Sequence, residues 1–410
     1  MTTLKHQDDV HSQPLPPEDQ SLMLRLLKWM REPARFTWQN LKEEFEALSP
    51  SEQVDIEDEQ QGLLEEIDET PGFVSDSLDA MENALEYIHG KEAYEMAMFV
   101  IPEYVQDDNF RLAFLRAERF NATAAAQRMV KYWERKVELF GADVAFKSFG
   151  SSILDLSKED LETFINGGIQ VLPERDEFGR TIIFMLLSNF GNKVDSILRY
   201  HWIILHMAIF DPIGGEFNQK YGLAQTITPG TPHPDVGPLL FHERQRLFAT
   251  FTKDVTTAIP MRPVGCHIFV PYENSHLLLR LTEKYLYGLG SVIRMRLNIY
   301  ILSHDKNEEV YSRLKEYGMG PSVLPKILGG HLQFNYQKWV RQKVHNMVWR
   351  HRVEIEKDKD QYYRNIASLL ELLSHNSDNK NEQEDLDTML RTMPLNGDVV
   401  DMMDEDTNSD

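Results

Sequence analysis

Strand-like and helix-like segments alternate after residue 150, and this alternation restricts the fold more than any other feature of the chain. Short β-branched and aromatic runs predict strands, and the longer runs between them have the apolar spacing of helices. The predicted strands are residues 169–173, 181–187, 220–230, 263–272 and 296–303. The predicted helices are residues 193–212, 237–260, 275–290 and 305–318. Such alternation indicates a layered α/β domain with a largely parallel sheet.

A helical subdomain is predicted ahead of the sheet, and the chain as a whole divides into seven parts. We expect its first helix over residues 75–100, with Ser75 or Asp76 as N-cap, and two more helices separated near Asn121. The parts are a disordered N-terminus (1–20), an amphipathic helical segment (21–48), an acidic linker (49–74), the helical subdomain (75–150), the α/β domain (151–333), a long helix (334–375) and an acidic disordered tail (376–410). The segment 21–48 either packs on its own domain or lies at a membrane interface.

Negative charge is concentrated in two segments. Residues 51–70 hold nine acids and no base, and residues 376–410 hold eleven acids and two bases. Together they carry −18 of the net −22, so the rest of the chain is nearly neutral and can present basic faces. We expect both segments to be solvated linker and tail, with an inhibitory or docking role as the alternative.

Composition and motifs do not predict a catalytic, metal or cofactor site. Cys266, the single cysteine, excludes an intrachain disulfide and fits a reducing compartment. Cys266 and His267 are neighbours on a predicted strand, so they face opposite sides and cannot form a nucleophile–base pair. His201 and His206 lie about 140° apart on a predicted helix, which is poor geometry for a metal.

The ends and the apolar runs of the chain predict no targeting segment and no membrane span. The N-terminal residues contain acids and no apolar signal region. Runs of about 18 apolar residues, the length that a spanning helix needs, do not occur.

Four motifs occur in a characteristic order along the chain. They are FLRAERFN (114–121), DEFGRTIIF (176–184), IPMRPVGCHIFVPY (259–272) and LPKILGG (324–330). Over about residues 75–332, this ordered set resembles the CRAL-TRIO lipid-binding family, whose members carry phospholipids, tocopherol or retinaldehyde. The resemblance implies an apolar pocket with the sheet as its floor and the helix 275–290 as its lid, without catalysis or a cofactor.

The same resemblance implies which residues line that pocket. The expected lid side chains include Leu278, Leu281 and Tyr285, and Gly288 loosens the end of the lid. The expected floor residues are Phe184, Phe269, Ile299 and Ile301, with Ile183, Leu186, Leu223 and His267 as further candidates. Sequence does not settle which alternate residues face inward, because a slip of one residue inverts every side chain.

Three arginines are the candidates for an anionic head group. Arg262 matches a basic position at the pocket rim in the tocopherol and retinaldehyde branch, and Arg294 and Arg296 match a second basic cluster after the lid. Met261 stands where inositol-specific members carry a glutamate, which disfavours that specificity. Guanidinium groups suit a phosphate. Alternatively, Arg294 and Arg296 are solvated or pair with acids such as Asp305 or Glu308.

The sequence therefore predicts a non-enzymatic, cytoplasmic lipid-binding or lipid transfer protein that touches anionic membranes transiently and binds no nucleic acid. The alternative is a phosphoinositide-sensing regulatory adaptor that membranes recruit, with the acidic tail as a contact for a protein partner. The basic amphipathic stretch 338–352 either docks on a membrane, packs on its own domain or holds the tail. Exchange of a lipid between vesicles separates a carrier from a sensor.

Overall fold

The computed structural model describes most of the chain between residues 34 and 350. The described residues are 34, 36–147, 152–190, 194–211, 214–228, 255–272, 275, 279, 283, 286, 289–303, 307–350 and 372. The predicted N-terminus (1–20) and acidic tail (376–410) lie outside them, as do Leu278, Leu281, Tyr285 and Gly288.

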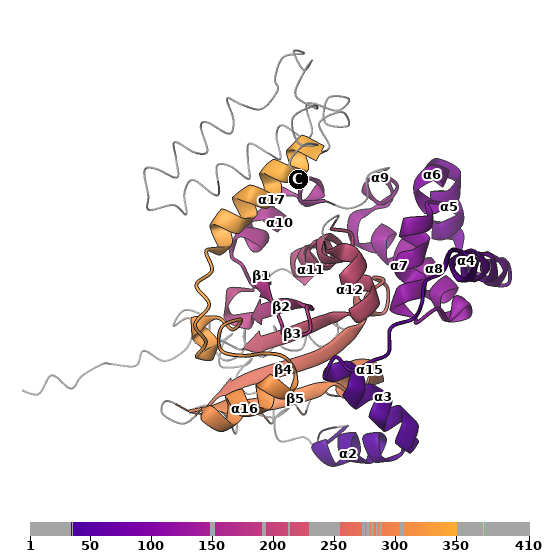
Figure 1. Ribbon diagram of the computed structural model, residues 1–410. Coiled ribbons are helices and arrows are strands. Elements are labelled where there is room, and N and C mark those ends of the chain that lie inside the picture. Colours follow the sequence, from indigo (N-terminus) through magenta and orange to yellow (C-terminus); the bar gives the residue numbers. More distant parts are fainter. Residues whose placement is uncertain are drawn as a thin grey trace, which may run out of the picture.

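A five-stranded sheet forms the centre of the molecule (Figure 1). Its strands are β1 (Ile169–Arg175), β2 (Thr181–Leu186), β3 (Leu223–Thr228), β4 (Pro263–Pro271) and β5 (Leu297–Leu302). They lie in the order β1-β2-β3-β4-β5, with β1 antiparallel to β2 and the other three pairs parallel. The predicted α/β architecture with a largely parallel sheet is confirmed.

Both faces of the sheet are covered, which explains the almost continuous apolar sequence of its inner strands. On one face, α11 (Val194–Ile209) packs on alternate strand residues that include Ile183, Leu223 and Ile268. On the other face, α16 (Glu308–Glu316) and the segment after it pack on Ile182 and Phe269. The sheet therefore separates two hydrophobic clusters, one on each side.

The helical subdomain has more breaks than the sequence suggested. Its helices are α4 (Pro71–Glu86), α5 (Glu92–Val100), α6 (Pro102–Val105), α7 (Asp108–Ala117), α8 (Ala122–Phe140) and α9 (Ala142–Ala145). The predicted single helix over 75–100 is wrong, because its N-cap is Thr70 and the chain leaves the helix between α4 and α5. The predicted break near Asn121 is confirmed, since the Asn121 side chain caps α8.

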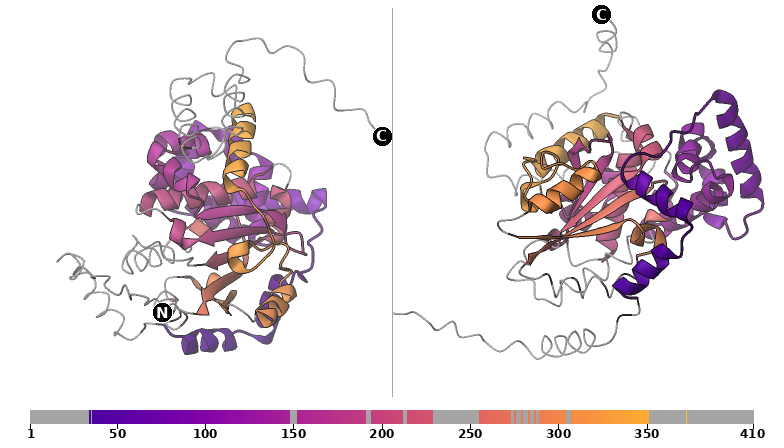
Figure 2. Two further views of the ribbon diagram at one scale, coloured as in Figure 1. Left: turned by 90° about the vertical axis from the view of Figure 1, so that its left-hand side faces the viewer. Right: turned by 60° about the horizontal axis from the view of Figure 1, so that its bottom comes forward.

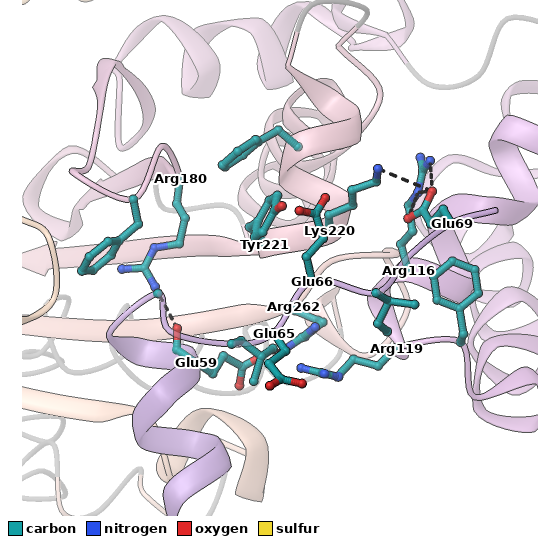
Figure 3. A pocket seen from close by; sticks show the side chains of 16 residues that line it. Glu59, Glu65, Glu66, Glu69, Arg116, Arg119, Arg180, Lys220, Tyr221 and Arg262 are labelled. Atoms are coloured by element: carbon teal, nitrogen blue, oxygen red, sulfur yellow. Dashed lines mark hydrogen bonds and ion pairs between the residues drawn. The ribbon is translucent and has the colours of Figure 1, made fainter.

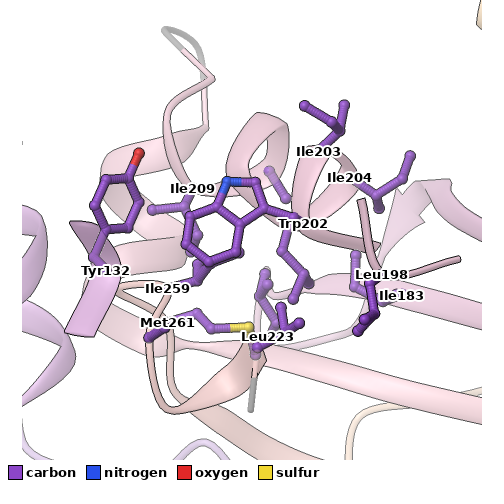
Figure 4. Close-up of a cluster of buried hydrophobic side chains, with 14 of the residues drawn as sticks. Tyr132, Ile183, Leu198, Trp202, Ile203, Ile204, Ile209, Leu223, Ile259 and Met261 are labelled. Atoms are coloured by element: carbon purple, nitrogen blue, oxygen red, sulfur yellow. The ribbon is translucent and has the colours of Figure 1, made fainter. Parts of the chain in front are cut away.

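This subdomain shares its core with the sheet layer. Tyr132 of α8 packs against Trp202 of α11, with ring centroids 5.1 Å apart. Trp202 in turn lies in one cluster with Ile183 and Leu223 of the sheet (Figure 4). Burial of such large aromatic and aliphatic side chains contributes about 1.5–3 kcal/mol each. The helices and the sheet are therefore held together by a continuous hydrophobic core.

Helix α17 (Tyr336–Arg350) lies within the range predicted for a long helix (334–375), and its described side chains pack on the domain itself. Val340 and Val344 are buried in the main cluster, and Lys343 pairs with Asp211 at 3.0 Å. Of the alternatives for the basic stretch 338–352, packing on its own domain applies to residues up to 344. The remaining α-helices of the described ranges are α10 (Lys158–Ile165), α12 (Gly215–Tyr221) and α15 (Ser291–Arg294). None of the helices in the described ranges is long and apolar enough to cross a membrane.

Two N-terminal helices lie at one end of the sheet, beside α15 (Figures 1 and 2). They are α2 (Trp38–Glu46) and α3 (Pro50–Gln60). Ser49 caps α3 and forms a capping box with Glu52, and Pro50 fixes the first turn. The expectation of an unstructured linker is therefore wrong for residues 50–60, although they are strongly acidic.

Candidate functional site

A basic side chain lies at or shortly before the start of each parallel strand. Arg180 directly precedes β2, Lys220 precedes β3 by three residues, and Arg262 and Arg296 directly precede β4 and β5. Because parallel strands begin at the same edge of a sheet, these four side chains form a row. We call Arg180, Lys220, Arg262 and Arg296 the basic edge.

An acidic segment, residues 59–69, runs along the basic edge from Glu59, beside Arg180 and Arg262, to Glu69, beside Arg116 and Lys220 (Figure 3). We call it the acidic strap. It leaves the end of α3 through a turn at Gly62, whose φ of +67° is left-handed and whose missing Cβ makes room for the ring of Phe178. The strap then runs to Glu69, next to the start of α4.

Glu59 forms the first contact of the strap and bridges two arginines of the basic edge. One carboxylate oxygen accepts from Arg262, and the other accepts from Arg296, whose Nε lies 2.7 Å away. Glu59 is only 6% exposed. Burial lowers the pKa of both guanidinium groups to about 10, and for Arg262 the nearby Arg296 adds to this effect. Both arginines therefore stay charged at neutral pH, and one carboxylate faces two positive groups.

Arg180 fixes the end of α3 through hydrogen bonds to its last carbonyls. Its Nη1 donates to the backbone carbonyls of Glu59 and Gln60 at 3.0 and 2.9 Å. Its Nε donates to Asp176 at 2.6 Å, and its side chain is buried. A cation at a helix C-terminus satisfies carbonyls that have no partner within the helix. The arginine of the DEFGR motif thus positions Glu59 rather than solvating a strand end.

Glu69 forms the last contact of the strap. It accepts from Arg116 in a bidentate arrangement, with Nε and Nη2 at 3.0 and 2.7 Å, and lies 3.5 Å from Lys220. Between the two ends of the strap, Glu66 and burial raise the pKa of the Tyr221 hydroxyl. Carboxylates of the strap therefore pair with bases of distant segments, from Arg296 before β5 to Arg116 of α7.

Two cavities flank the strap and meet at Arg262. One, of about 310 Å³, is lined by bases that include Arg116, Arg119 and Lys220. The other, of about 390 Å³, adds Arg128 and Arg296. The side chain of Arg119 is exposed in both, and it has no hydrogen bond or ion pair with any residue that the structure describes. The lining chemistry suits an anion larger than a carboxylate.

The structure separates the three arginines that the sequence singled out. Arg262 and Arg296 meet at Glu59, but Arg294 turns to α2, where Glu44 accepts two hydrogen bonds at 2.9 and 2.7 Å. The guanidinium of Arg294 also lies 4.6 Å from the centre of the Phe36 ring. Ion pairing, the alternative to the phosphate role, therefore holds for Arg294 and Arg296, with Glu44 and Glu59 instead of Asp305 or Glu308 as partners.

The four predicted floor residues lie on two faces of the sheet. Phe184 and Phe269 belong to the cluster under α16, whereas Ile299 packs on the cluster of α11. Ile301 has the same strand parity as Ile299 and is 42% exposed. One cavity on one face cannot be lined by all four, so the predicted floor is wrong as a set. Ile183 and Leu223 lie on the α11 side, and Leu186 lies on the α16 side.

Residues of the expected lid lie on the α11 side of the sheet as well. Leu286 and Leu289 are buried in the same cluster as Cys266 and Ile268 of β4. Gln225 of β3 has the same strand parity as Leu223, and it is fully buried, with neither amide atom hydrogen-bonded to a residue that the structure describes. A buried amide without a partner costs about 1–3 kcal/mol. This face therefore combines an apolar wall with one unsatisfied polar group.

Among the described residues, Cys266 and His267 do not form a nucleophile–base pair, and the histidines do not belong to a metal-ligand cluster. Cys266 faces the α11 cluster, and burial raises the pKa of its thiol to about 12. His267 points to the other face, where its Nδ1 lies 3.0 Å from the Tyr300 hydroxyl, so the predicted separation of this pair is confirmed. His201 and His206 are buried, and no cluster of three potential metal ligands occurs in the part of the chain described.

Sequence reasoning missed Glu59, Glu69, Arg116, Arg180 and Lys220 as members of this site. A signal for Arg180 and Lys220 was present, because each predicted parallel strand either begins with Lys or Arg or directly follows one. Comparison of the chain with protein-family models and with curated proteins finds no match.

Proposed function

We propose that the chain is a non-enzymatic lipid-binding and lipid transfer protein of the CRAL-TRIO type. It would carry a hydrophobic ligand, a phospholipid or an isoprenoid, between membranes that it contacts only transiently from the cytoplasm. The order of the four motifs and the α/β architecture support this proposal. The ligand would lie on the α11 side of the sheet, beneath the segment that ends with Leu286 and Leu289.

The observation that carries the proposal is the convergence of Arg262 and Arg296 on a single carboxylate. Two guanidinium groups at the ends of neighbouring strands form a preorganised anion site, and a lipid phosphate presents the same bridging oxygens as Glu59. The unsatisfied Gln225 amide supports it further, because ligand pockets are mostly apolar with few polar groups that orient the ligand.

A phosphoinositide-sensing adaptor is the second candidate, and the acidic strap favours it. A site whose bases pair with carboxylates of the same chain has the properties of a switch rather than of a permanent binding site. In that case the basic edge would recruit the protein to a membrane, and no ligand would leave with it.

The test is native mass spectrometry of the full-length protein with organic extraction, followed by transfer of the extracted lipid between donor and acceptor vesicles. A stoichiometric lipid that moves between vesicles supports the carrier. Vesicle binding without a bound lipid and without transfer supports the adaptor. A protein that carries no lipid and ignores vesicles containing phosphoinositide contradicts both candidates.

A further inference from the structure

We propose that the acidic strap is an intramolecular competitor of the basic edge, and that a multiply phosphorylated inositol group displaces it. The inference rests on the proposed function, because it concerns the regulation of the same anion site. The displacing chemistry is that of several phosphates on one ring, whether on a membrane lipid or on a free inositol phosphate.

Charge in the 310 Å³ cavity is segregated by origin. Its acidic lining residues all belong to the strap, and they are Glu59, Glu65, Glu66 and Glu69. Its bases all come from the helical subdomain and the strand starts, and they are Arg116, Arg119, Arg180, Lys220 and Arg262. Arg180 and Lys220 also pair with acids of their own elements, Asp176 at 2.6 Å and Glu216 at 2.8 Å, and Glu216 contacts Arg116 at 3.2 Å. The strap supplies the four carboxylates that line the cavity, and without it the five lining bases outnumber these two acids. Removal of the strap would leave a groove of positive charge.

Side chains hold residues 64–69 of the strap in place, whereas its start is also held through the backbone carbonyls of Glu59 and Gln60, which accept from Arg180. Residues 64–69 make no backbone–backbone hydrogen bond with the part of the chain that the structure describes. Leu63 is 62% exposed, and Glu65 and Glu66 are exposed as well. Segments with few backbone hydrogen bonds and little buried apolar surface open at low free-energy cost. Residues 64–69 can therefore leave the groove while the sheet and the helical subdomain stay folded, and release of Glu59 also breaks the two hydrogen bonds from Arg180 to the end of α3.

Replacing the Glu59 carboxylate by another anion changes the free energy of the buried Arg262 and Arg296 only a little, because both stay paired. Removing a buried partner outright leaves a buried charge uncompensated, but an intact buried ion pair is close to neutral in net stability. A phosphate that takes the place of the Glu59 carboxylate keeps Arg262 and Arg296 paired. The free energy of displacement then depends on how many charges the incoming group brings.

Several ion pairs must be replaced together, and this sets the selectivity. Glu59 contacts Arg262 and Arg296, and Glu69 contacts Arg116 and Lys220. A lipid with a single net negative charge cannot replace all of these contacts, whereas a ring with several phosphates can. The strap is thus expected to exclude phosphatidylserine membranes and to admit membranes or solutes rich in inositol phosphates.

The experiment uses the full chain and two readouts. Hydrogen exchange of residues 61–63, whose amides donate backbone hydrogen bonds to the end of α3, is followed with and without inositol hexakisphosphate. Vesicle binding is measured with phosphatidylcholine that contains either phosphatidylinositol bisphosphate or phosphatidylserine at equal total charge. We expect exchange in the strap to rise on ligand addition, and the wild type to prefer the bisphosphate vesicles. Glu59→Gln should bind phosphatidylserine vesicles at least roughly ten-fold more tightly than the wild type.

Glu57→Gln is the matched control, because it removes the same charge from an exposed position on the same helix. It should bind as the wild type does. Strap release by hexakisphosphate but not by vesicles supports the proposal with a free inositol phosphate as the ligand. Unchanged strap exchange at saturating ligand, while Arg296→Gln weakens binding, overturns the strap inference and leaves the proposed function standing. Unaltered binding in Arg296→Gln overturns both.

Discussion

Glu59 and Arg262 lie 203 residues apart in the sequence and form an ion pair at the edge of the sheet, with Arg296 on the other oxygen of the same carboxylate. Arg294, only two residues before Arg296, takes no part in this cluster and pairs with Glu44 of α2. Two arginines of one short stretch therefore belong to different parts of the structure, and their removal should have different effects.

Arg296→Gln is expected to weaken binding to vesicles with phosphatidylinositol bisphosphate by roughly ten-fold or more, since a charge-assisted contact to phosphate contributes about 1.5–3 kcal/mol. Arg294→Gln is the matched control and should change the affinity by less than about two-fold, because this side chain lies against α2. Vesicle co-sedimentation of the two variants measures the difference. If the two variants weaken vesicle binding equally, the lipid phosphate contacts Arg294 on the α2 side as well as Arg296.

Gln225→Leu should stabilise the protein and impair recognition of its ligand. Both amide atoms of Gln225 are buried without a partner, so their replacement by methyl groups removes a cost of about 1–3 kcal/mol. Chemical denaturation measures the gain, and mass spectrometry of extracted lipids measures the change in bound ligand.

Thr226→Val is the control for Gln225→Leu. Thr226 is the next residue of β3, buried on the opposite face, and its hydroxyl also lacks a hydrogen bond. This variant should be stabilised without any change in the extracted lipid. Loss of the lipid in Thr226→Val, with retention in Gln225→Leu, would place the ligand on the α16 side.

Lys136→Met should remove a pH dependence of stability. Burial lowers the pKa of Lys136 to about 7, with the Asp155 charge acting in the opposite direction, and its Nζ lies over aromatic rings, the nearest being Trp133 with its centre 4.8 Å away. Because this pKa lies below its usual value, the unfolded chain binds the proton first as the pH falls. Titration of Lys136 therefore lowers the free energy of unfolding progressively as the pH falls from about 10.5 to about 7, and the protein is more stable at the high end of this range.

Unfolding free energies at pH 7.5 and 9 test this prediction. The wild type should be more stable at pH 9, by up to about 2 kcal/mol from this residue. Lys136→Met should lose that difference, whereas Lys131→Met, an exposed lysine on the same helix, should keep it. A wild type whose stability is flat across this range would contradict the buried neutral lysine.

Gly330→Ala should destabilise the protein, because a Cβ at this position would collide with the backbone carbonyl of Leu324. Backbone cannot move aside as a side chain can, so we expect a loss of roughly 2–4 kcal/mol in unfolding free energy. Gly72→Ala in α4 is the control, since its Cβ would meet nothing within 4 Å. Thermal melts of both variants compare them directly, and an unaffected Gly330→Ala would show that the turn at the end of LPKILGG relaxes.

Local patterns predicted those parts of the fold that local interactions determine. The strands follow from β-branched runs, and the break before α8 follows from Asn121, which caps that helix. The split between the two faces could not be predicted in the same way. Phe184 and Ile183 are both buried, because β2 is covered on both sides, and such a strand has no polar alternation to show its orientation.

The strap was missed because its partners are remote. A run of acids without bases predicts solvation when only neighbouring residues are considered. Glu59 is nevertheless buried, since Arg296 lies 237 residues away in the sequence and adjacent in space. Tertiary charge pairing outweighed local composition here. The base ahead of each parallel strand was visible in the sequence, but its meaning depends on the sheet order that brings the strand starts together.

The strap is joined covalently to α3 at one end and to α4 at the other, so its carboxylates are never diluted. A ligand from solution competes against an effective concentration that chain length sets, in the millimolar range for short flexible tethers. That concentration falls roughly as the −3/2 power of length once the tether exceeds its span. The proposed displacement therefore predicts that residues inserted between Gly62 and Glu69 change the concentration of inositol phosphate needed to release the strap, while Arg262, Arg296 and Arg116 stay unaltered.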